Sequence, residues 1–309
     1  MKVWLPYDSA AEATARLGDL PYGVTFDVLA DNRLPDGEAE AVEWIALPNY
    51  SAGKVVAQMR WEALPRLSWI QLGSAGFEHV IDQLPPHIGV CNAAGVHDAG
   101  TAELAIGLAL AALRRIDRYA IDRMTQTFAP VHTDSLADKR VLIIGHGRIG
   151  SAIERRLAGF EVASITRVAR CARTDPQVHP ASDLPQLVGQ ADVIFLSLPG
   201  SDSTHKIIDA DLLSRMPDGT LVVNVGRGPL IDTDALLAEQ GRVRAALDVT
   251  DPEPLPSGHP LWGAEFVTWT PHVGGRNRSY ETRYDALIRA QLGRLVTREP
   301  LLNIVRSPQ

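Results

Sequence analysis

The sequence has few cysteines and no long apolar segment. Its 309 residues include two cysteines, Cys91 and Cys171, and contain no Cys-x-x-Cys or His-Glu-x-x-His pattern. A disulfide framework is therefore not expected, no metal site is predicted, and a reduced, cytoplasmic setting fits best. The longest apolar run, residues 104–113, has about half the length that a membrane-spanning helix requires. The first residues indicate a strand rather than a secretion signal.

A surplus of positive charge is also missing. The chain has 37 Asp and Glu against 30 Lys and Arg, a formal net charge of −7. Proteins that bind nucleic acid mainly through its phosphates usually have a basic surplus, so no nucleic-acid partner is expected. Hydrophobic residues make up 45% and charged residues 22%, as in an ordinary folded protein. A chain of this length buries roughly 75% of its unfolded surface, enough for two cores.

The pattern of apolar segments changes along the chain and divides it into two parts. Residues 1–98 have short apolar runs separated by Pro, Gly and Asp, typical of an open α/β unit. After Arg140, apolar strands alternate with helices or loops, which indicates a doubly wound parallel sheet. These strands are predicted at Val141–Ile144, Val162–Ile165, Val193–Leu198, Leu221–Val225, Ala245–Asp248 and Phe266–Thr270. We therefore predict an α/β protein with two doubly wound parallel-sheet domains. One is formed by residues 99–276, and the other, of flavodoxin-like type, by residues 1–98 and 277–309.

A glycine-rich turn links the first strand and helix of the second domain. Residues 145–150 read Gly-His-Gly-Arg-Ile-Gly, a Gly-x-Gly-x-x-Gly motif between a strand and a helix. Gly145 permits the tight turn, Gly147 lets the backbone approach a pyrophosphate, and Gly150 allows the helix to pack closely. The position of the motif disfavours a plain strand-to-helix turn and predicts a Rossmann dinucleotide-binding domain.

The end of the second strand indicates which dinucleotide is preferred. NAD-binding proteins place Asp or Glu roughly 20 residues after the glycines, to bind the ribose 2′-hydroxyl. Here Thr166 stands at the acidic position, and residues 164–174 contain no carboxylate before Asp175. Arg167 and Arg170 could bind a 2′-phosphate instead. We therefore expect NADPH (NADP) to be preferred over NAD, with two ordinary surface arginines as the other interpretation.

Three polar residues follow later strands of the same sheet. Arg227 follows the fourth strand, Glu253 the fifth and His272 the sixth. Ligands of open α/β sheets bind beyond the carboxyl ends of the strands, so these side chains are expected to converge there. A guanidinium can orient a 2-oxo acid, and an imidazolium can protonate its oxygen as hydride reaches the carbon. A carboxylate next to the imidazole raises the pKa of that ring. Each residue alone is more often structural, but the set predicts hydride transfer to a 2-oxo acid.

The segments around these residues resemble the D-isomer-specific 2-hydroxyacid dehydrogenase family. They are Asn224–Asp232, Leu247–Val249 with Glu253–Pro256, and Thr270–Gly275, and the resemblance covers essentially the whole chain. It implies Arg227 as the substrate-orienting residue, His272 as the acid/base and Glu253 as its partner. It also implies that backbone groups of Ala75 and Gly76 bind the substrate carboxylate.

The motif and the resemblance together define the predicted cofactor site. Its residues are Gly145, Gly147, Arg148, Ile149, Gly150, Thr166, Arg167, Arg170, Leu198, Pro199, Thr204, Val225, Gly226, Asp248 and Gly274. The resemblance also implies a homodimer formed through the dinucleotide domain.

Departures from the family pattern bear on the substrate. Tyr50 replaces the basic residue of phosphoglycerate-type members, which disfavours a phosphorylated substrate. Formate dehydrogenases pair the histidine with Gln, so Glu253 disfavours formate. Glu78 stands where Asp is usual, Phe128 where Trp is frequent, and His146 where an apolar residue is common. The sequence gives no account of these last three changes.

The leading hypothesis is an NADPH-dependent reductase of a small 2-oxo acid, of the glyoxylate or hydroxypyruvate kind. A phosphoglycerate-dehydrogenase-like enzyme is one alternative. Another is an NAD(P)H-sensing binding protein of the corepressor type, because such proteins keep the same three residues. A further alternative is a dinucleotide-dependent oxidoreductase of another class. In that case the presence of Arg227, Glu253 and His272 after successive strands would be a coincidence.

Overall fold

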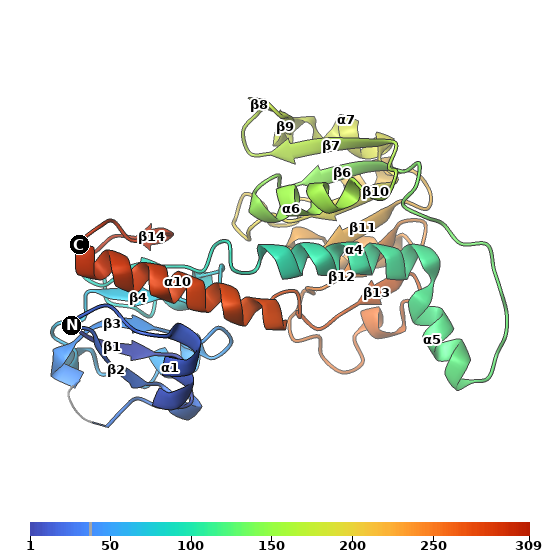
Figure 1. Ribbon diagram of the computed structural model, residues 1–309. Helices are drawn as coiled ribbons and strands as arrows, with labels where there is room; N and C mark the ends of the chain where they lie inside the picture. Colours follow the sequence, from blue (N-terminus) through green and yellow to red (C-terminus); the bar gives the residue numbers. More distant parts are fainter. Residues whose placement is uncertain (37–38) are drawn as a thin grey trace. The chain divides into compact units, whose positions relative to one another are not determined.

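The chain divides into two compact units (Figure 1). The computed structural model describes residues 1–36 and 39–309. Unit 1 comprises Met1–His97 and Arg278–Gln309, and unit 2 comprises Asp98–Asn277. Each unit is built on one mostly parallel sheet, of six strands in unit 1 and eight in unit 2. The predicted α/β fold with two doubly wound sheets is confirmed.

The sheet of unit 1 has the strand order β14-β5-β4-β3-β1-β2. Its neighbouring strands pair in parallel, except that β14 runs antiparallel to β5. The strands are β1 (Lys2–Leu5), β2 (Thr25–Val28), β3 (Val42–Ala46), β4 (Trp69–Gln71), β5 (Gly89–Cys91) and β14 (Ile304–Arg306). The helices are α1 (Ala10–Leu17), α2 (Ala52–Val56), α3 (Glu78–Ile81) and α10 (Arg278–Thr297).

Successive side chains of the strands in unit 1 enter two different cores. Trp4 and Ile45 pack in a cluster that includes residues of α2 and α3. Their neighbours Val3 and Trp44 pack in a second cluster with residues of α1 and α10. Because successive side chains of a strand point to opposite faces, this alternation shows that helices cover both faces of the sheet.

Helix α10 brings the C-terminal part of the chain back into unit 1 through buried polar contacts. Gln291 Nε2 donates to Gln71 Oε1 over 2.7 Å, and both side chains are fully buried. Asp285 accepts from the Tyr7 hydroxyl over 2.8 Å and from two nitrogens of Arg16 over 3.0 Å. Buried polar groups are tolerated when they are hydrogen-bonded, so these contacts fix the position of α10 on the sheet.

The sheet of unit 2 has the strand order β13-β12-β11-β10-β6-β7-β9-β8. Its strands pair in parallel, except that β8 runs antiparallel to β9. The strands are β6 (Arg140–Ile144), β7 (Ser164–Ala169), β8 (Arg173–Thr174), β9 (Gln177–Pro180), β10 (Val193–Leu196), β11 (Leu221–Asn224), β12 (Arg244–Leu247) and β13 (Val267–Trp269). The helices are α4 (Asp98–Arg114), α5 (Ile116–Met124), α6 (Arg148–Leu157), α7 (Leu184–Leu187), α8 (Ala210–Arg215) and α9 (Thr233–Ala238).

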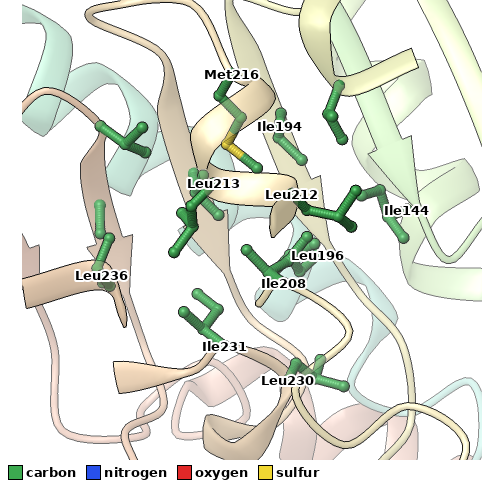
Figure 2. Packing of buried hydrophobic residues seen from close by; sticks show 14 of the residues in the cluster. Ile144, Ile194, Leu196, Ile208, Leu212, Leu213, Met216, Leu230, Ile231 and Leu236 are labelled. Carbon is green, nitrogen blue, oxygen red and sulfur yellow. The ribbon is translucent and has the colours of Figure 1, made fainter. Parts of the chain in front are cut away.

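Both faces of this sheet are buried. Phe195 packs in a cluster with residues of α4 and α6. On the other face, Ile194 and Leu196 pack against residues of α8 and α9, including Leu213 and Leu236 (Figure 2). Strands covered on both sides have no polar face, which explains why the sequence of β10 is apolar throughout.

One predicted strand of unit 2 was wrong in position. The strand expected at Val162–Ile165 is β7, at Ser164–Ala169. It pairs with β6 as far as Val168 opposite Ile144. The polar residues Thr166 and Arg167 interrupt the apolar pattern in the sequence, but pairing with β6 continues the strand past them. Both therefore lie within the strand, and Arg170 is the first residue after it.

The other predicted strands of unit 2 lie within two residues of the observed ones. The short strands β8 and β9 were missed, because their sequences contain hardly any apolar residues. In the part of the chain that the structure describes, no helix has both the length and the apolar character needed to cross a bilayer. Helix α5 begins beside the edge strand β13, where the Thr268 hydroxyl donates to Asp117 Oδ2 over 2.6 Å. It is followed by a long loop that leads to β6 (Figure 1).

The core of unit 1 allows a test of stability. Ile45 on β3 is fully buried, so Ile45→Ala should lower the free energy of unfolding by about 2–5 kcal/mol. Tyr22 is fully exposed, and Tyr22→Ala is the matched control, with an expected change of about 0.5 kcal/mol or less. Urea unfolding followed by tryptophan fluorescence measures both. Equal, small losses would contradict the placement of Ile45 in the core.

Candidate active site

The turn after β6 holds the first glycine of the glycine-rich motif. Gly145 has a φ of +103°, a conformation that favours glycine. A Cβ at Gly145 would lie 2.8 Å from the carbonyl carbon of Ser197, and the Ser197 hydroxyl donates to the Gly145 carbonyl oxygen over 2.8 Å. Strands β6 and β10 are neighbours where the strand order reverses, which is where ligands of such sheets bind.

The other two glycines shape the start of α6. A Cβ at Gly150 would lie 2.3 Å from the Gly145 carbonyl oxygen, so the helix packs directly against the turn. Gly147 is the N-cap of α6. Among the residues that the structure describes, no side chain caps the helix there, and a Cβ at Gly147 would meet nothing within 4 Å. The amides of the first helical turn are therefore approachable through open space. Such amides attract a phosphate, so this turn fits the diphosphate of a dinucleotide.

Two further turns meet at the same edge of the sheet. Gly226, after β11, comes so close to the turn after β10 that a Cβ would lie 2.6 Å from the Leu198 carbonyl oxygen. The Asn224 side chain accepts from the Gly226 amide over 3.0 Å and donates to the Arg227 carbonyl oxygen over 2.8 Å. These turns carry the residues that the sequence assigns to this part of the cofactor site: Leu198, Pro199, Thr204, Val225 and Gly226.

The second strand differs most from the sequence prediction. Thr166 is inside β7, opposite Leu142, and does not stand at the end of the strand. Arg167 is engaged by Glu154 of α6 through Nε, over 2.9 Å, and through Nη2. Their hydrogen bonds lower the pKa of Glu154 and raise that of Arg167. Arg167 is thus committed to an ion pair, and only Arg170 of the two predicted phosphate ligands extends beyond the strand into solvent.

His272 and Glu253 form a hydrogen-bonded pair on the loops after β13 and β12. His272 Nδ1 and Glu253 Oε1 are 2.6 Å apart. The exposed fractions of the two side chains are 47% and 41%. The hydrogen bond and negative charge of Glu253 raise the pKa of His272 above its ordinary value, against the effect of burial. The same hydrogen bond lowers the pKa of Glu253. The imidazole therefore holds its proton to a higher pH than a free histidine.

Asp248 fixes the loop that carries His272. Its side chain is 2% exposed, and Oδ1 accepts from the Thr270 hydroxyl over 2.7 Å and from the Val273 amide over 2.8 Å. Oδ2 accepts from the Gly274 amide over 2.9 Å. The sequence assigned Asp248 and Gly274 to the cofactor site. In the structure the Asp248 carboxylate holds this loop, partly through the Gly274 amide, and the contact of both residues with a cofactor stays a prediction.

Arg227 lies on the turn after β11, half-buried. Its Nη1 donates to the Gly226 carbonyl oxygen over 2.8 Å, and a Cβ at Gly200 would lie 3.2 Å from its Cγ. The positive charge of Arg227 lowers the pKa of both His272 and Glu253. Unit 2 therefore brings the three predicted catalytic side chains within electrostatic reach of one another.

The predicted carboxylate-binding loop belongs to unit 1. The Ala75 carbonyl oxygen accepts from Asn92 Nδ2 over 2.7 Å, and the Gly76 carbonyl oxygen accepts from the Ser74 hydroxyl over 2.6 Å. The amides of Ala75 and Gly76 donate to no group within residues 1–36 and 39–309. Two amides with no internal acceptor fit an anionic ligand.

Some residues of the site had no role in the sequence analysis. Asn224 holds the turn of Arg227, and Thr270 binds the Asp248 carboxylate. His146 is buried in the glycine-rich turn, with Nε2 2.6 Å from Glu154 Oε2. A signal existed for Asn224, since a polar amide at the end of an apolar strand needs a partner nearby. No pattern in the sequence predicts the pairing of His146 with Glu154, because the two residues are eight positions apart across a turn.

Comparison with known proteins places these residues in a family. Residues 106–274 match the NAD-binding domain of the D-isomer specific 2-hydroxyacid dehydrogenases, more than half of the chain. A glyoxylate reductase of Thermofilum pendens is 33% identical over 227 residues, which are 69% of this chain and 67% of that protein. A glyoxylate/hydroxypyruvate reductase B of Escherichia coli is 30% identical over 236 residues, 72% of each chain.

Solved structures share the fold over nearly the whole length. An NADPH-dependent glyoxylate/hydroxypyruvate reductase from Sinorhizobium meliloti, solved with NADP and malonate, is 26% identical with a TM-score of 0.74. The match covers 98% of this chain and 96% of that one. A D-isomer specific 2-hydroxyacid dehydrogenase from Xanthobacter autotrophicus, solved with NADPH and MES, is 24% identical with a TM-score of 0.79, over 98% and 97% of the chains. This chain therefore belongs to the D-isomer-specific 2-hydroxyacid dehydrogenase family of NAD(P)-dependent oxidoreductases.

Proposed function

We propose that this chain is an NADPH-dependent reductase of a small 2-oxo acid, of the glyoxylate or hydroxypyruvate kind. The observation that carries the proposal is the Glu253–His272 pair next to Arg227, on the turns that follow the strands of a dinucleotide-binding sheet. The product is a 2-hydroxy acid, of D configuration where it is chiral. The relatives named glyoxylate and hydroxypyruvate reductases support this choice of substrate.

Each residue has a chemical role in this proposal. Bound NADPH supplies the hydride. The amides of Ala75 and Gly76 bind the substrate carboxylate, and the Arg227 guanidinium orients the 2-oxo group and polarises it. His272 Nε2 gives its proton to the carbonyl oxygen as the hydride reaches the carbon, so the alcohol forms without a free alkoxide. Glu253 holds the ring through Nδ1 and favours its protonated form.

The preference for NADPH rests on charge near the end of β7. No carboxylate lies between the glycine-rich motif and Asp175 except those of Glu154 and Glu161, and Arg167 neutralises that of Glu154. Arg170 follows the strand and is exposed. A cation at this position suits a 2′-phosphate and offers no acceptor for a 2′-hydroxyl. The related reductase from Sinorhizobium meliloti, named NADPH-dependent and solved with NADP, supports the same preference.

Helix α5 and the loop after it support a homodimer. This arm, residues 116–131, exposes the side chains of Ile116, Ile121, Met124, Phe128 and Val131, with Met124 75% and Phe128 96% exposed. Large exposed apolar groups that gather on one segment mark an interaction surface. The arm belongs to unit 2, in agreement with the expectation of a dimer through the dinucleotide domain.

The reaction and the role of Arg227 are tested together. NADPH oxidation is followed with glyoxylate, hydroxypyruvate, pyruvate and phenylpyruvate as substrates. The wild type should reduce glyoxylate or hydroxypyruvate best, and Arg227→Ala should lower kcat/KM by about 100- to 1000-fold, because the developing oxygen charge loses its cation.

Arg215→Ala, which removes an exposed arginine paired with Asp211, is the matched control and should leave the rate unchanged. Tight NADPH binding without turnover of any 2-oxo acid would contradict the proposed reaction and favour a cofactor sensor.

The role of Glu253 is tested by the pH dependence of reduction. His272 must be protonated to act as the acid, so kcat/KM should fall as the pH rises through its pKa. Glu253 raises that pKa. Glu253→Gln should therefore move the alkaline fall of the pH profile to lower pH, with activity retained at acidic pH.

The control is Asp183→Asn, which changes the carboxylate 3.2 Å from the ring of His179 and should leave the profile in place. His272→Gln should abolish the alkaline fall of kcat/KM. If kcat/KM falls at the same pH in Glu253→Gln as in the wild type, Glu253 is not the partner that raises the pKa of His272.

The dimer is tested by sedimentation. The wild type should sediment as a dimer, and the double substitution Met124→Asp/Phe128→Asp should give a monomer with an unchanged circular dichroism spectrum, since charge on an apolar interface opposes association. Tyr22→Asp, at an exposed aromatic residue of unit 1, is the control. A monomeric wild type would refute the proposed assembly.

A further inference from the structure

A cluster of charged side chains lies next to the glycine-rich turn and has no role in the proposed reaction. It consists of His146, Glu154, Arg167 and Arg173, all in unit 2. We propose that Arg173, held against the turn by His146, recognises the cofactor 2′-phosphate together with Arg170, and that Arg167 is a positioning residue that neutralises Glu154. This inference rests on the proposed preference for NADPH and changes the set of arginines that the sequence indicated.

Arg173 is bound to the turn itself. Its Nη2 lies 2.6 Å from the His146 carbonyl oxygen and 3.1 Å from His146 Nδ1. A guanidinium can only donate hydrogen bonds, so Nδ1 must be the acceptor. The ring proton is then on Nε2, which donates to Glu154 Oε2 over 2.6 Å. His146 therefore links the carboxylate on one side to the guanidinium on the other.

The charges of the cluster do not cancel. Glu154 is neutralised by Arg167, whose Nε and Nη2 bind its two carboxylate oxygens. Across residues 1–36 and 39–309, no carboxylate forms an ion pair with Arg173 or Arg170. Both are exposed, whereas Arg167 has 22% of its side chain exposed. Two cations without acidic partners thus remain beside the turn.

The backbone places Arg170 and Arg173 at the position where dinucleotide-binding folds bind the adenosine ribose. The amides of Gly145 and His146 both donate to the Val168 carbonyl oxygen, over 2.8 and 3.0 Å, so the turn is joined to the end of β7. Arg170 follows this strand directly, and Arg173 begins the hairpin of β8 and β9. In dinucleotide-binding folds the end of the second strand meets the ribose 2′ group. A phosphate there carries about two negative charges and matches two unpaired arginines.

Arg167 acts on this site indirectly. Its guanidinium donates hydrogen bonds to Glu154, which also accepts a hydrogen bond from His146. Without Arg167, the Glu154 carboxylate would keep its full negative charge next to the phosphate site. Loss of Arg167 should therefore weaken phosphate binding through repulsion, and removal of the Glu154 charge should restore it.

The experiment measures binding of 2′,5′-ADP and 5′-ADP to the full chain by calorimetry, with no turnover involved. The wild type should bind 2′,5′-ADP more tightly. Arg173→Gln should lower the affinity for 2′,5′-ADP about 10- to 100-fold, the effect of one charge-assisted hydrogen bond or two, and leave that for 5′-ADP nearly unchanged. Arg173→Lys, which keeps the charge, should retain part of the preference.

Two further comparisons separate direct from indirect roles. Arg167→Gln should weaken 2′,5′-ADP binding, and Arg167→Gln/Glu154→Gln should recover it, whereas Glu154→Gln should not rescue Arg173→Gln. Arg155→Gln, at an exposed arginine of α6, is the control and should change neither affinity.

The outcomes distinguish this inference from the proposed cofactor preference. Equal wild-type affinities for the two nucleotides would refute the preference for NADPH and the inference with it. A wild type that prefers 2′,5′-ADP, with the preference intact in Arg173→Gln, would overturn the inference alone. Equal weakening of both nucleotides in Arg173→Gln would show that Arg173 only supports the turn, and would overturn it as well.

Discussion

The buried carboxylate of Asp248 is the contact on which the arrangement of the catalytic residues depends. Its two oxygens accept three hydrogen bonds from the loop after β13, and its backbone carbonyl oxygen accepts from the His272 amide over 2.7 Å. His272 has a φ of +50°, which costs a residue with a Cβ roughly 1–2 kcal/mol. The surrounding hydrogen bonds offset that cost, and the ring is held where Glu253 binds its Nδ1.

Electrostatics in this protein are local. The chain is acidic overall, with a formal charge of −7, although its proposed substrate and cofactor are anions. Attraction for them therefore comes from single groups at the carboxyl edge of the unit 2 sheet and from backbone amides. Ion pairing decides which groups are available. Arg167 is neutralised by Glu154, whereas Arg170 and Arg173 are exposed and form no ion pair with a carboxylate of residues 1–36 or 39–309. Counting arginines along the sequence does not reveal this difference.

Much of the fold could be predicted from local patterns. Strands such as β10 and β11 are short apolar runs, and a strand covered on both faces has no other pattern to show. The glycine-rich motif predicted the start of α6, because neighbouring backbone atoms leave no room for a Cβ at Gly145 or Gly150. Strand β7 was misplaced for the opposite reason. Thr166 and Arg167 are polar, and only pairing with β6 shows that the strand continues through them.

The sequence by itself determined the residue types and their order: glycines at a strand-to-helix turn, then Arg227, Glu253 and His272 after successive strands. Chemistry that depends on residue type and on strand order is readable from sequence, because parallel strands end at one edge. Only the tertiary structure decided which partner each charged group takes. Glu154 lies closer in sequence to Arg148 than to Arg167, yet it binds Arg167, and the Asp248 carboxylate binds the loop that carries His272. Partners of this kind are brought together by the packing of helices and loops on the sheet. This packing produces no periodic pattern in the sequence.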